Sequence, residues 1–192
     1  MSVGFHTFDA DGADRLEDPS RYRYLSREEL VAAVAPSADD HVVDLGSGTG
    51  FYTDDVAPHV GSVTAVDLQA EMHERYREKG VPDNVRLVTA GADDVPLSDG
   101  SVDAVVSTLT YHEFPTASTV AEIARLLGPD GRVVIADWSA NGDGEAGPPT
   151  DERYDAAHAV DALADAGITA RRVDERPETF LVTAARDIRA DE

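Results

Sequence analysis

The sequence predicts an α/β fold built on a mainly parallel, doubly wound sheet with helices on both faces. Short apolar runs rich in β-branched residues alternate with patterns of helical spacing, which is the order such sheets require. The runs are too continuous for strands with one solvated face, so we expect them to be buried. A chain of 192 residues suits a single core, and we expect one domain over residues 1–192.

The first expected element is a helix within an N-terminal helical cap segment, residues 1–36. In "SREELVAAVAP", Ser26 and Glu29 form the capping box that starts a helix, and the pattern stops near Pro36. The remaining residues, 37–186, are expected to form the α/β core.

The core begins with five buried strands, which we place at residues 41–45, 62–67, 85–90, 103–109 and 132–138. Helical patterns lie between them at residues 50–60, 69–80 and 116–128. A loop dense in glycine and proline follows at 139–150, and a helix over 151–167 and strand-like runs at 169–174 and 179–186 finish the core.

The charge composition is strongly acidic, with a formal net charge of -22. Lys79 is the only lysine beside 15 arginines, and 25 aspartates outnumber 13 glutamates. Such a composition is typical of a salt-rich cytoplasm, where a Debye length of about 3 Å or less quenches self-repulsion. We therefore expect a halophilic source, with an ordinary acidic protein as the alternative.

Several classes of function are disfavoured by composition. No basic stripe predicts nucleic-acid binding, and no apolar run approaches the roughly 20 residues of a membrane span. The N-terminus lacks a basic and apolar secretory signal, so a soluble cytoplasmic protein is expected. There is no cysteine, and the six histidines are scattered without ligand spacing, so we expect no metal site.

Three glycines at every second position follow the first strand, in "VVDLGSGTGFYT". They allow a sharp turn and a close approach of the backbone to a ligand at the carboxyl end of the strand. A dinucleotide site requires G-x-G-x-x-G, but here Phe51 stands at the place of the third glycine. Asp44 would repel a diphosphate and would favour a cofactor that carries an ammonium and a sulfonium.

Four segments in order, "VVDLGSGTG", "AVDLQAEM", "AGADDVPLSDGSVDAVVSTLTYHE" and "LLGPDGRVVIADW", resemble the class I S-adenosylmethionine-dependent methyltransferases. Within them the chain is most similar to the type 11 group, which includes the ubiquinone and menaquinone biosynthesis methyltransferases. The resemblance runs from about residue 20 to 186. It implies a Rossmann-like, seven-stranded sheet whose last strand is antiparallel, and methyl transfer from S-adenosylmethionine that leaves S-adenosylhomocysteine.

The resemblance also implies which residues hold the cofactor. The methionine part falls on the glycine loop, and Asp67 accepts both ribose hydroxyls, although it could instead cap the next helix. The adenine lies between Leu68 and the backbone N–H of Ala92. The family often has an aspartate where this chain has Gly91, so either Asp93 substitutes or adenine is held more loosely. The full set of cofactor candidates is Asp44, Gly46, Ser47, Gly48, Gly50, Asp67, Leu68, Ala92, Asp93 and Thr108.

In the family the segment after the fourth strand faces the substrate, which makes Tyr111 and His112 candidate catalytic residues. His112, next to Glu113, could act as a general base, because imidazole titrates near neutral pH. We favour the alternative, in which His112 only shapes the pocket.

The acceptor is expected to be a small molecule, quinone-type as a first guess, and protein or RNA acceptors stay open. Candidate acceptor-binding residues are Tyr22, Tyr24, Trp138 and the "GDGEAGPP" loop. Two other functions also stay open: a non-catalytic S-adenosylmethionine-binding module and an NAD(P)-dependent oxidoreductase. The sequence does not indicate an oligomeric state.

Overall fold

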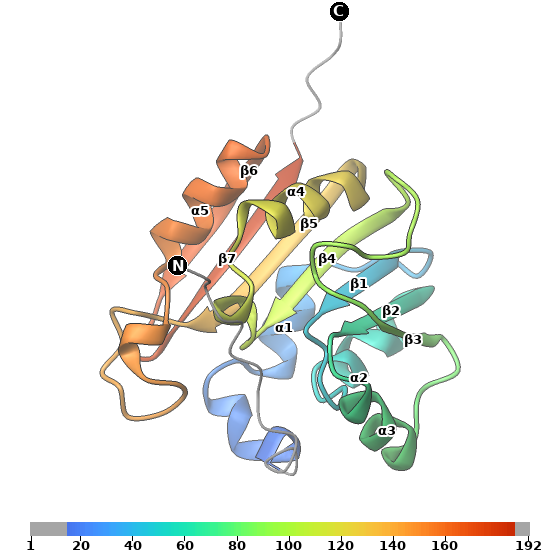
Figure 1. Cartoon of the computed structure of the whole chain (residues 1–192), viewed down its shortest axis with the longest axis horizontal. Helices are drawn as coiled ribbons and strands as arrows, with labels where there is room; N and C mark the ends of the chain where they lie inside the picture. The colour runs from blue at the N-terminus through green and yellow to red at the C-terminus, as the bar shows by residue number, and fades with distance from the viewer. Residues whose placement is uncertain (1–14, 187–192) are drawn as a thin grey trace, which may run out of the picture.

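The computed structural model describes residues 15–186 and arranges seven strands in one sheet, in the order β3-β2-β1-β4-β5-β7-β6 (Figure 1). The strands are β1 His41–Leu45, β2 Ser62–Asp67, β3 Val85–Thr89, β4 Val102–Thr108, β5 Leu127–Trp138, β6 Ile168–Glu175 and β7 Thr179–Arg186. The first five pair in parallel, whereas β7 is antiparallel to both of its neighbours. The predicted fold class and the antiparallel last strand are therefore confirmed.

The described chain has five α-helices: α1 Arg27–Val34, α2 Thr53–Val56, α3 Ala70–Lys79, α4 Ala117–Leu126 and α5 Ala156–Asp165. Three of them, α1, α4 and α5, begin at a residue whose side chain caps the helix. Ser26 accepts the N–H of Glu29 at 3.2 Å, as the capping box predicts. Short 3-10 turns lie at η2 Pro19–Arg23, η3 Ala57–His59, η4 Tyr111–Glu113 and η5 Thr150–Glu152. None of the described helices is long and apolar enough to cross a membrane.

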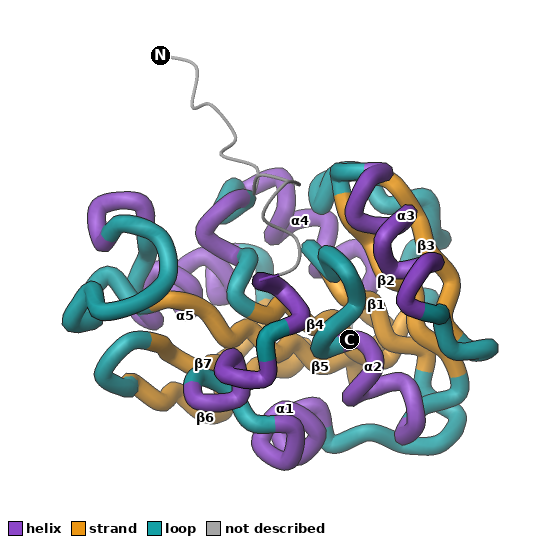
Figure 2. The backbone as a smooth tube through the Cα atoms, turned by 90° about the horizontal axis from the view of Figure 1, so that it is seen from below, coloured by secondary structure: helices purple, strands orange, loops and turns teal. Residues whose placement is uncertain are grey.

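The two faces of the sheet bury separate apolar cores, because successive strand residues point to opposite sides. On one face Val43 and Val105 pack with side chains of α4 and α5. On the other face Val42 and Val106 pack with side chains of α1 and α2. Figure 2 shows α4 and α1 on opposite sides of the strands.

Several boundaries differ from those predicted; for example, the helix expected over 151–167 is α5, which begins at Ala156. The helix expected over 116–128 ends at Leu126, and β5 begins at Leu127 instead of 132. Leu127 pairs with Val102 and Arg132 with Ala104, so β5 carries extra residues opposite one step of β4. Likewise the helix expected over 50–60 is only α2 and the short turn η3, because Pro58 lacks the N–H that a longer helix needs.

Strand order reverses at β1, which has β2 on one side and β4 on the other. The loops after these parallel strands therefore converge at one edge of the sheet. This is the place where ligands bind in open α/β sheets.

Candidate functional site

A cavity of about 390 Å³ lies where these loops converge. Its volume is within the range of small-molecule sites. The loops after β1, β2, β3 and β4 form its walls, and the segment ahead of α1 closes it with Leu16 and Arg21. Eight of the ten predicted cofactor residues line it: Gly46, Ser47, Gly48, Asp67, Leu68, Ala92, Asp93 and Thr108. The structure thus brings together segments that are far apart in the sequence.

The glycine loop owes its shape to three positive φ angles, 73° at Gly46, 55° at Gly48 and 83° at Gly50. Only Gly48 leaves room toward the cavity, where a Cβ would lie 3.4 Å from the Leu16 side chain. A Cβ on Gly50 would lie 2.1 Å from the ring of Tyr76. Gly50 is therefore required by the packing behind the loop, and it does not line the cavity.

Asp67, at the end of β2, holds the loops on both sides of it. Its Oδ2 accepts the N–H of Gly48 at 2.8 Å, and its Oδ1 accepts the N–H of Gln69 at 2.9 Å. Burial raises the pKa of Asp67, and these two N–H groups offset part of that effect. Each carboxylate oxygen keeps a further acceptor site. Asp67 therefore supports the start of α3 and can still accept ligand hydroxyls.

Asp44 lies behind the glycine loop, outside the cavity lining. Its Oδ2 accepts the Thr53 hydroxyl at 2.6 Å, while Oδ1 is buried without a hydrogen-bond partner among the described residues. Burial raises the pKa of Asp44 to about 6, with Thr53 opposing the shift. The Ser47 hydroxyl, also at the loop, is likewise buried without a partner in the described chain. These two buried oxygens beside the glycine loop can therefore still accept hydrogen bonds.

In the turn after β3, the carboxylate of Asp93 lies close to Gly91. A Cβ on Gly91 would lie 2.8 Å from Oδ1 of Asp93. The Asp93 carboxylate thus occupies the space that a side chain at position 91 would fill. Both residues line the cavity.

The segment after β4 is fixed under the glycine loop. Leu109 adopts a φ of 56°, unusual for a residue with a Cβ, and lines the cavity. Thr110 packs against Gly46, whose added Cβ would lie 2.2 Å from the Thr110 methyl group. The catalytic candidates Tyr111 and His112 do not line the cavity, whereas Glu113 does.

His112, which is partly buried, pairs with the buried Asp137 near the end of β5. Its Nδ1 lies 3.0 Å from Oδ1 of Asp137, and its backbone N–H donates to Oδ2 at 2.6 Å. Asp137 also accepts the N–H of Trp138 at 2.8 Å. Burial disfavours the imidazolium, but the hydrogen bond and charge of Asp137 outweigh burial and raise the pKa of His112. This pair ties η4 to β5.

The candidate acceptor residues pack outside the cavity. Tyr22 lies against Phe51, with ring centroids 4.8 Å apart, and donates to Asp55 at 2.9 Å. Tyr24 meets Trp138 edge-on at 4.7 Å. Gly147 of the "GDGEAGPP" loop packs against the Trp138 ring. A Cβ added to Gly147 would lie 2.4 Å from this ring.

Sequence reasoning missed several residues that line the cavity or support it. Leu16 and Arg21 come from the segment ahead of α1, which carries no motif, and Asp137 lies in a strand whose apolar pattern hid its role. Phe51 lines the cavity, although the sequence marked it only as a departure from the dinucleotide pattern. Only the pairing of distant segments reveals these residues.

Comparison with known proteins decides the family. The family model described as "Methyltransferase domain", of the type 11 group, matches residues 43–135. A solved S-adenosylmethionine-dependent methyltransferase from Aquifex aeolicus is 31% identical, with a TM-score of 0.86, and the match covers 94% of this chain and 100% of that one. The chain belongs to the S-adenosylmethionine-dependent methyltransferases. Its cofactor is accordingly S-adenosylmethionine.

Curated relatives match this methyltransferase over shorter stretches. An uncharacterized methyltransferase of Mycobacterium tuberculosis is 37% identical over 111 residues, which are 58% of this chain and 44% of the relative. A demethylmenaquinone methyltransferase of Clavibacter sepedonicus is 35% identical over 117 residues, which are 60% of this chain and 48% of the relative. The matches thus span less than half of these relatives.

The cavity of this methyltransferase fits the chemistry of its cofactor. Asp67 offers carboxylate acceptors for hydroxyl groups, and the Ser47 hydroxyl, which belongs to a residue of the cavity lining, has no hydrogen-bond partner among the described residues. Leu68, 55% exposed, offers an apolar surface at the cavity wall. Nothing in this donor set conflicts with a nucleoside that carries a charged amino-acid chain.

Proposed function

We propose that the chain transfers the methyl group of S-adenosylmethionine to a small-molecule acceptor by in-line displacement at the sulfonium. The observation that carries the proposal is the cavity at the carboxyl ends of β1 to β4, closed by the segment ahead of α1. The cofactor, when bound, supplies an already activated methyl group, which leaves with the S–C bond broken and its electron pair on sulfur. The chain's own task is to hold the acceptor in line and exclude water.

In this proposal Asp67 binds the ribose and the glycine loop binds the amino-acid end. Asp67 has an acceptor site left on each oxygen, and Gly48 is the loop glycine with room toward the cavity. Leu68 covers the adenine face, Thr108 lies beneath the cofactor, and Ala92 donates its N–H to adenine.

Asp93 takes over the contact that an aspartate at position 91 would make with the adenine amino group. Support comes from its Oδ1, which stands 2.8 Å from the place of a Cβ on Gly91. The carboxylate reaches the same region from two residues further along the chain. Adenine recognition is therefore retained in this proposal.

His112 serves as a positioning residue in this proposal, and Tyr111 as a core residue. Neither side chain lines the cavity, and Tyr111 is fully buried. Burial raises the pKa of Tyr111 to about 12, which keeps its phenol protonated at neutral pH. The pair of His112 with Asp137 fixes the segment from Leu109 to Phe114, which does face the cavity.

We infer that the acceptor is a small apolar or planar molecule of the quinol class. The support is twofold: the Clavibacter sepedonicus relative is a demethylmenaquinone methyltransferase, and the cavity is lined by apolar and aromatic side chains such as Phe51, Leu109 and Phe114. As the acceptor forms its new bond to the methyl carbon, it loses a proton, which passes to water.

We also propose that the acidic composition is an adaptation to a salt-rich cytoplasm. The net charge of -22 repels itself strongly at low ionic strength. Folding should therefore be retained in molar potassium chloride and weakened in dilute buffer. Thermal unfolding measured over a salt series tests this, and a stability independent of salt would contradict it.

The test of the activity is the release of S-adenosylhomocysteine from S-adenosylmethionine in the presence of quinols and catechols, followed by mass spectrometry of the acceptor. Asp67→Ala should abolish turnover and weaken cofactor binding about 100-fold, because two hydrogen bonds to a charged group are lost. Glu71→Ala, an exposed change on α3, is the matched control and should behave as the wild type. Cofactor binding without turnover on any acceptor would instead favour a non-catalytic binding module.

A further inference from the structure

Strand β6 forms one edge of the sheet, with β7 as its only strand neighbour in the described chain (Figure 1). An edge strand presents backbone N–H and C=O groups that can pair with another strand. An irregular step between Ala170 and Arg172 interrupts the pairing with β7, and the residues from Arg172 to Glu175 pair regularly. A further strand can therefore pair along this second half of β6.

Val173 lies in this half and is exposed. Of the large apolar side chains in the described chain, only Leu68 and Val173 are strongly exposed, at 55% and 47%. Leu68 lines the cavity, whereas Val173 does not. One exposed valine is ordinary by itself, so the charges beside it decide what it can contact.

The charges change sign across Val173, in the run "RRVDE" at residues 171–175. Arg172 and Asp174 flank the valine, and their side chains are 51% and 32% exposed. Residues directly opposite each other in two antiparallel strands lie on the same face and contact each other. When two copies of this strand run antiparallel with Val173 opposite Val173, Arg172 of each copy lies opposite Asp174 of the other.

Charged side chains on an edge strand usually prevent such pairing. On β6 their order has the opposite effect for a second copy of the chain, because each contact across the axis joins opposite charges. The strand is also a part of the chain with little acidic excess: residues 168–176 hold three arginines and two acidic residues, whereas the whole chain has a net charge of -22. The partner that this edge fits is therefore a second copy.

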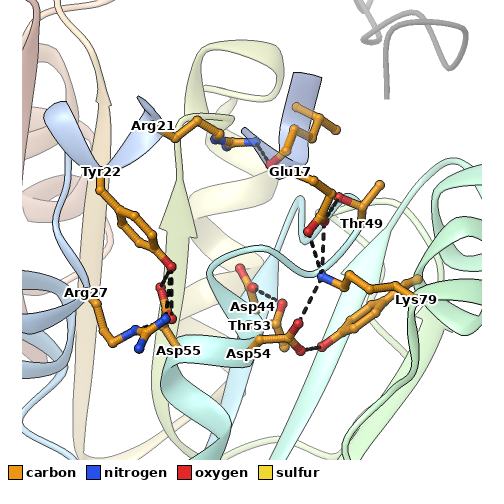
Figure 3. A network of polar contacts seen from close by, with 12 residues as sticks. Glu17, Arg21, Tyr22, Arg27, Asp44, Thr49, Thr53, Asp54, Asp55 and Lys79 are labelled. Atoms are coloured by element: carbon orange, nitrogen blue, oxygen red, sulfur yellow. Dashed lines mark hydrogen bonds and ion pairs between the residues drawn. The ribbon is translucent and has the colours of Figure 1, made fainter. Parts of the chain in front are cut away.

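The ion pair on β6 is local, unlike pairs that hold distant segments together. Figure 3 shows a pair of the second kind, Lys79 with Glu17 at 3.0 Å, whose residues are 62 positions apart. Arg172 pairs instead with Asp174, two residues along the same strand, at 2.6 Å. These two charges can therefore be exchanged without breaking an ion pair between distant segments of the described chain.

We propose that the β6 strands of two copies of the chain pair antiparallel about a twofold axis at Val173 and form a dimer with one continuous sheet. Arg172 and Asp174 of the two copies then form a cluster of four alternating charges, and the two Val173 side chains meet at the axis. No residue of β6 lines the cavity, so this dimer does not use the cofactor site. The pairing is independent of the proposed methyl transfer.

The first test is the oligomeric state of the full chain, measured by sedimentation equilibrium in molar potassium chloride. At this ionic strength a Debye length of about 3 Å suppresses the repulsion between two acidic chains. The wild type should dimerise reversibly with a dissociation constant of about 1 to 100 μM, because an edge contact is small. A wild type that stays monomeric at about 500 μM would overturn the inference.

Exchange of the two charges makes the test specific. Arg172→Glu alone and Asp174→Arg alone should each be monomeric, because like charges then face each other across the axis. A mixture of these two variants should form a heterodimer, since a negative strand then faces a positive one. The double variant Arg172→Glu/Asp174→Arg should dimerise within about threefold of the wild type.

The charge variants can also refute the pairing. Single variants that dimerise as the wild type does would show that the dimer uses another surface. The inference is equally wrong if the mixture and the double variant stay monomeric while circular dichroism shows that they are folded.

A cross-link locates the axis. The chain has no cysteine, so Val173→Cys introduces a single thiol. Opposite Cβ atoms in an antiparallel pair lie about 4.5 to 5.5 Å apart, so a short bismaleimide should join two copies at this position. Arg86→Cys, on the other edge strand β3, is the matched control and should not be joined. Cross-linking of the control alone, or of both variants equally, would contradict the proposed pairing.

Discussion

The carboxylate of Asp93 stands where a side chain of Gly91 would be, with Oδ1 2.8 Å from the position of a Cβ on Gly91. The φ angle of Gly91 is not in the left-handed region, so an aspartate can be accommodated there once Asp93 is removed. The two positions therefore form an exchangeable pair.

Asp93→Ala should weaken S-adenosylhomocysteine binding about tenfold, because a hydrogen bond to a carboxylate is lost. It should also remove the preference over the analogue that carries hypoxanthine in place of adenine. The double variant Gly91→Asp/Asp93→Ala should restore affinity to within about threefold. Asp94→Ala, at the exposed neighbouring position, is the control.

If Asp93→Ala leaves both the affinity and the base preference unchanged, Asp93 does not recognise adenine. If the double variant fails to recover while remaining folded, the geometric exchange is wrong.

Asp44→Asn should make the protein more stable at pH 8. Burial raises the pKa of Asp44 from its usual range to about 6, so the charged form costs folding free energy. This cost is absent near pH 4, grows as the pH rises from 4 to 6, and is complete above 6. The gain at pH 8 should be on the order of 2 to 3 kcal/mol. Denaturant unfolding at pH 4 and pH 8 measures it.

The same variant should bind the cofactor more weakly, because the ammonium loses its counter-charge. A stability difference that is equal at both pH values would show that burial does not raise the pKa of Asp44.

Asp137→Asn should lower the pKa of His112, because the hydrogen bond and charge of Asp137 are what raise it against burial. In the wild type the protonated pair stabilises the fold fully below the ordinary histidine pKa, and this contribution is lost as the pH rises through the raised value. Nuclear magnetic resonance of the imidazole protons gives both titrations. An unchanged pKa would show that the pair is not electrostatic.

His112→Ala should reduce turnover only modestly, by less than about tenfold, with unchanged cofactor affinity. His112→Asn, which can still donate to Asp137, should recover part of the loss. A loss of several hundredfold would instead assign His112 as the base.

Gly50→Ala should be much more destabilising than Gly167→Ala. Both glycines have similar φ angles, 83° and 75°. An added Cβ meets the Tyr76 ring at 2.1 Å in the first case and nothing within 4 Å in the second. We expect about 1 to 2 kcal/mol for Gly167→Ala and at least about 2 kcal/mol more for Gly50→Ala. Equal losses in urea unfolding would contradict this packing role.

The sequence allowed much of the fold to be predicted, because its strands and caps depend on local patterns. The first two strands have the predicted bounds, and Ser26 caps α1 as expected. The start of β5 was misplaced, because the irregular pairing of Leu127 with Val102 is not a local property.

The site was predictable only where a motif marks it. Asp67 and the glycine loop follow strands in a recognisable order, and they line the cavity. The contacts of Arg21 lie 5 to 31 residues away along the chain, and His112, which contacts Asp137, lies 25 residues away. No local sequence pattern predicts these contacts. The Gly50 position was interpreted as a ligand contact, whereas Tyr76 fills its space.

Calorimetric titration of the folded chain with S-adenosylmethionine, S-adenosylhomocysteine and NAD in molar potassium chloride tests the cofactor site most directly. We expect micromolar binding of the first two and no binding of NAD. Failure of folded protein to bind either sulfur compound would contradict the proposed cofactor site and, with it, the proposed methyl transfer.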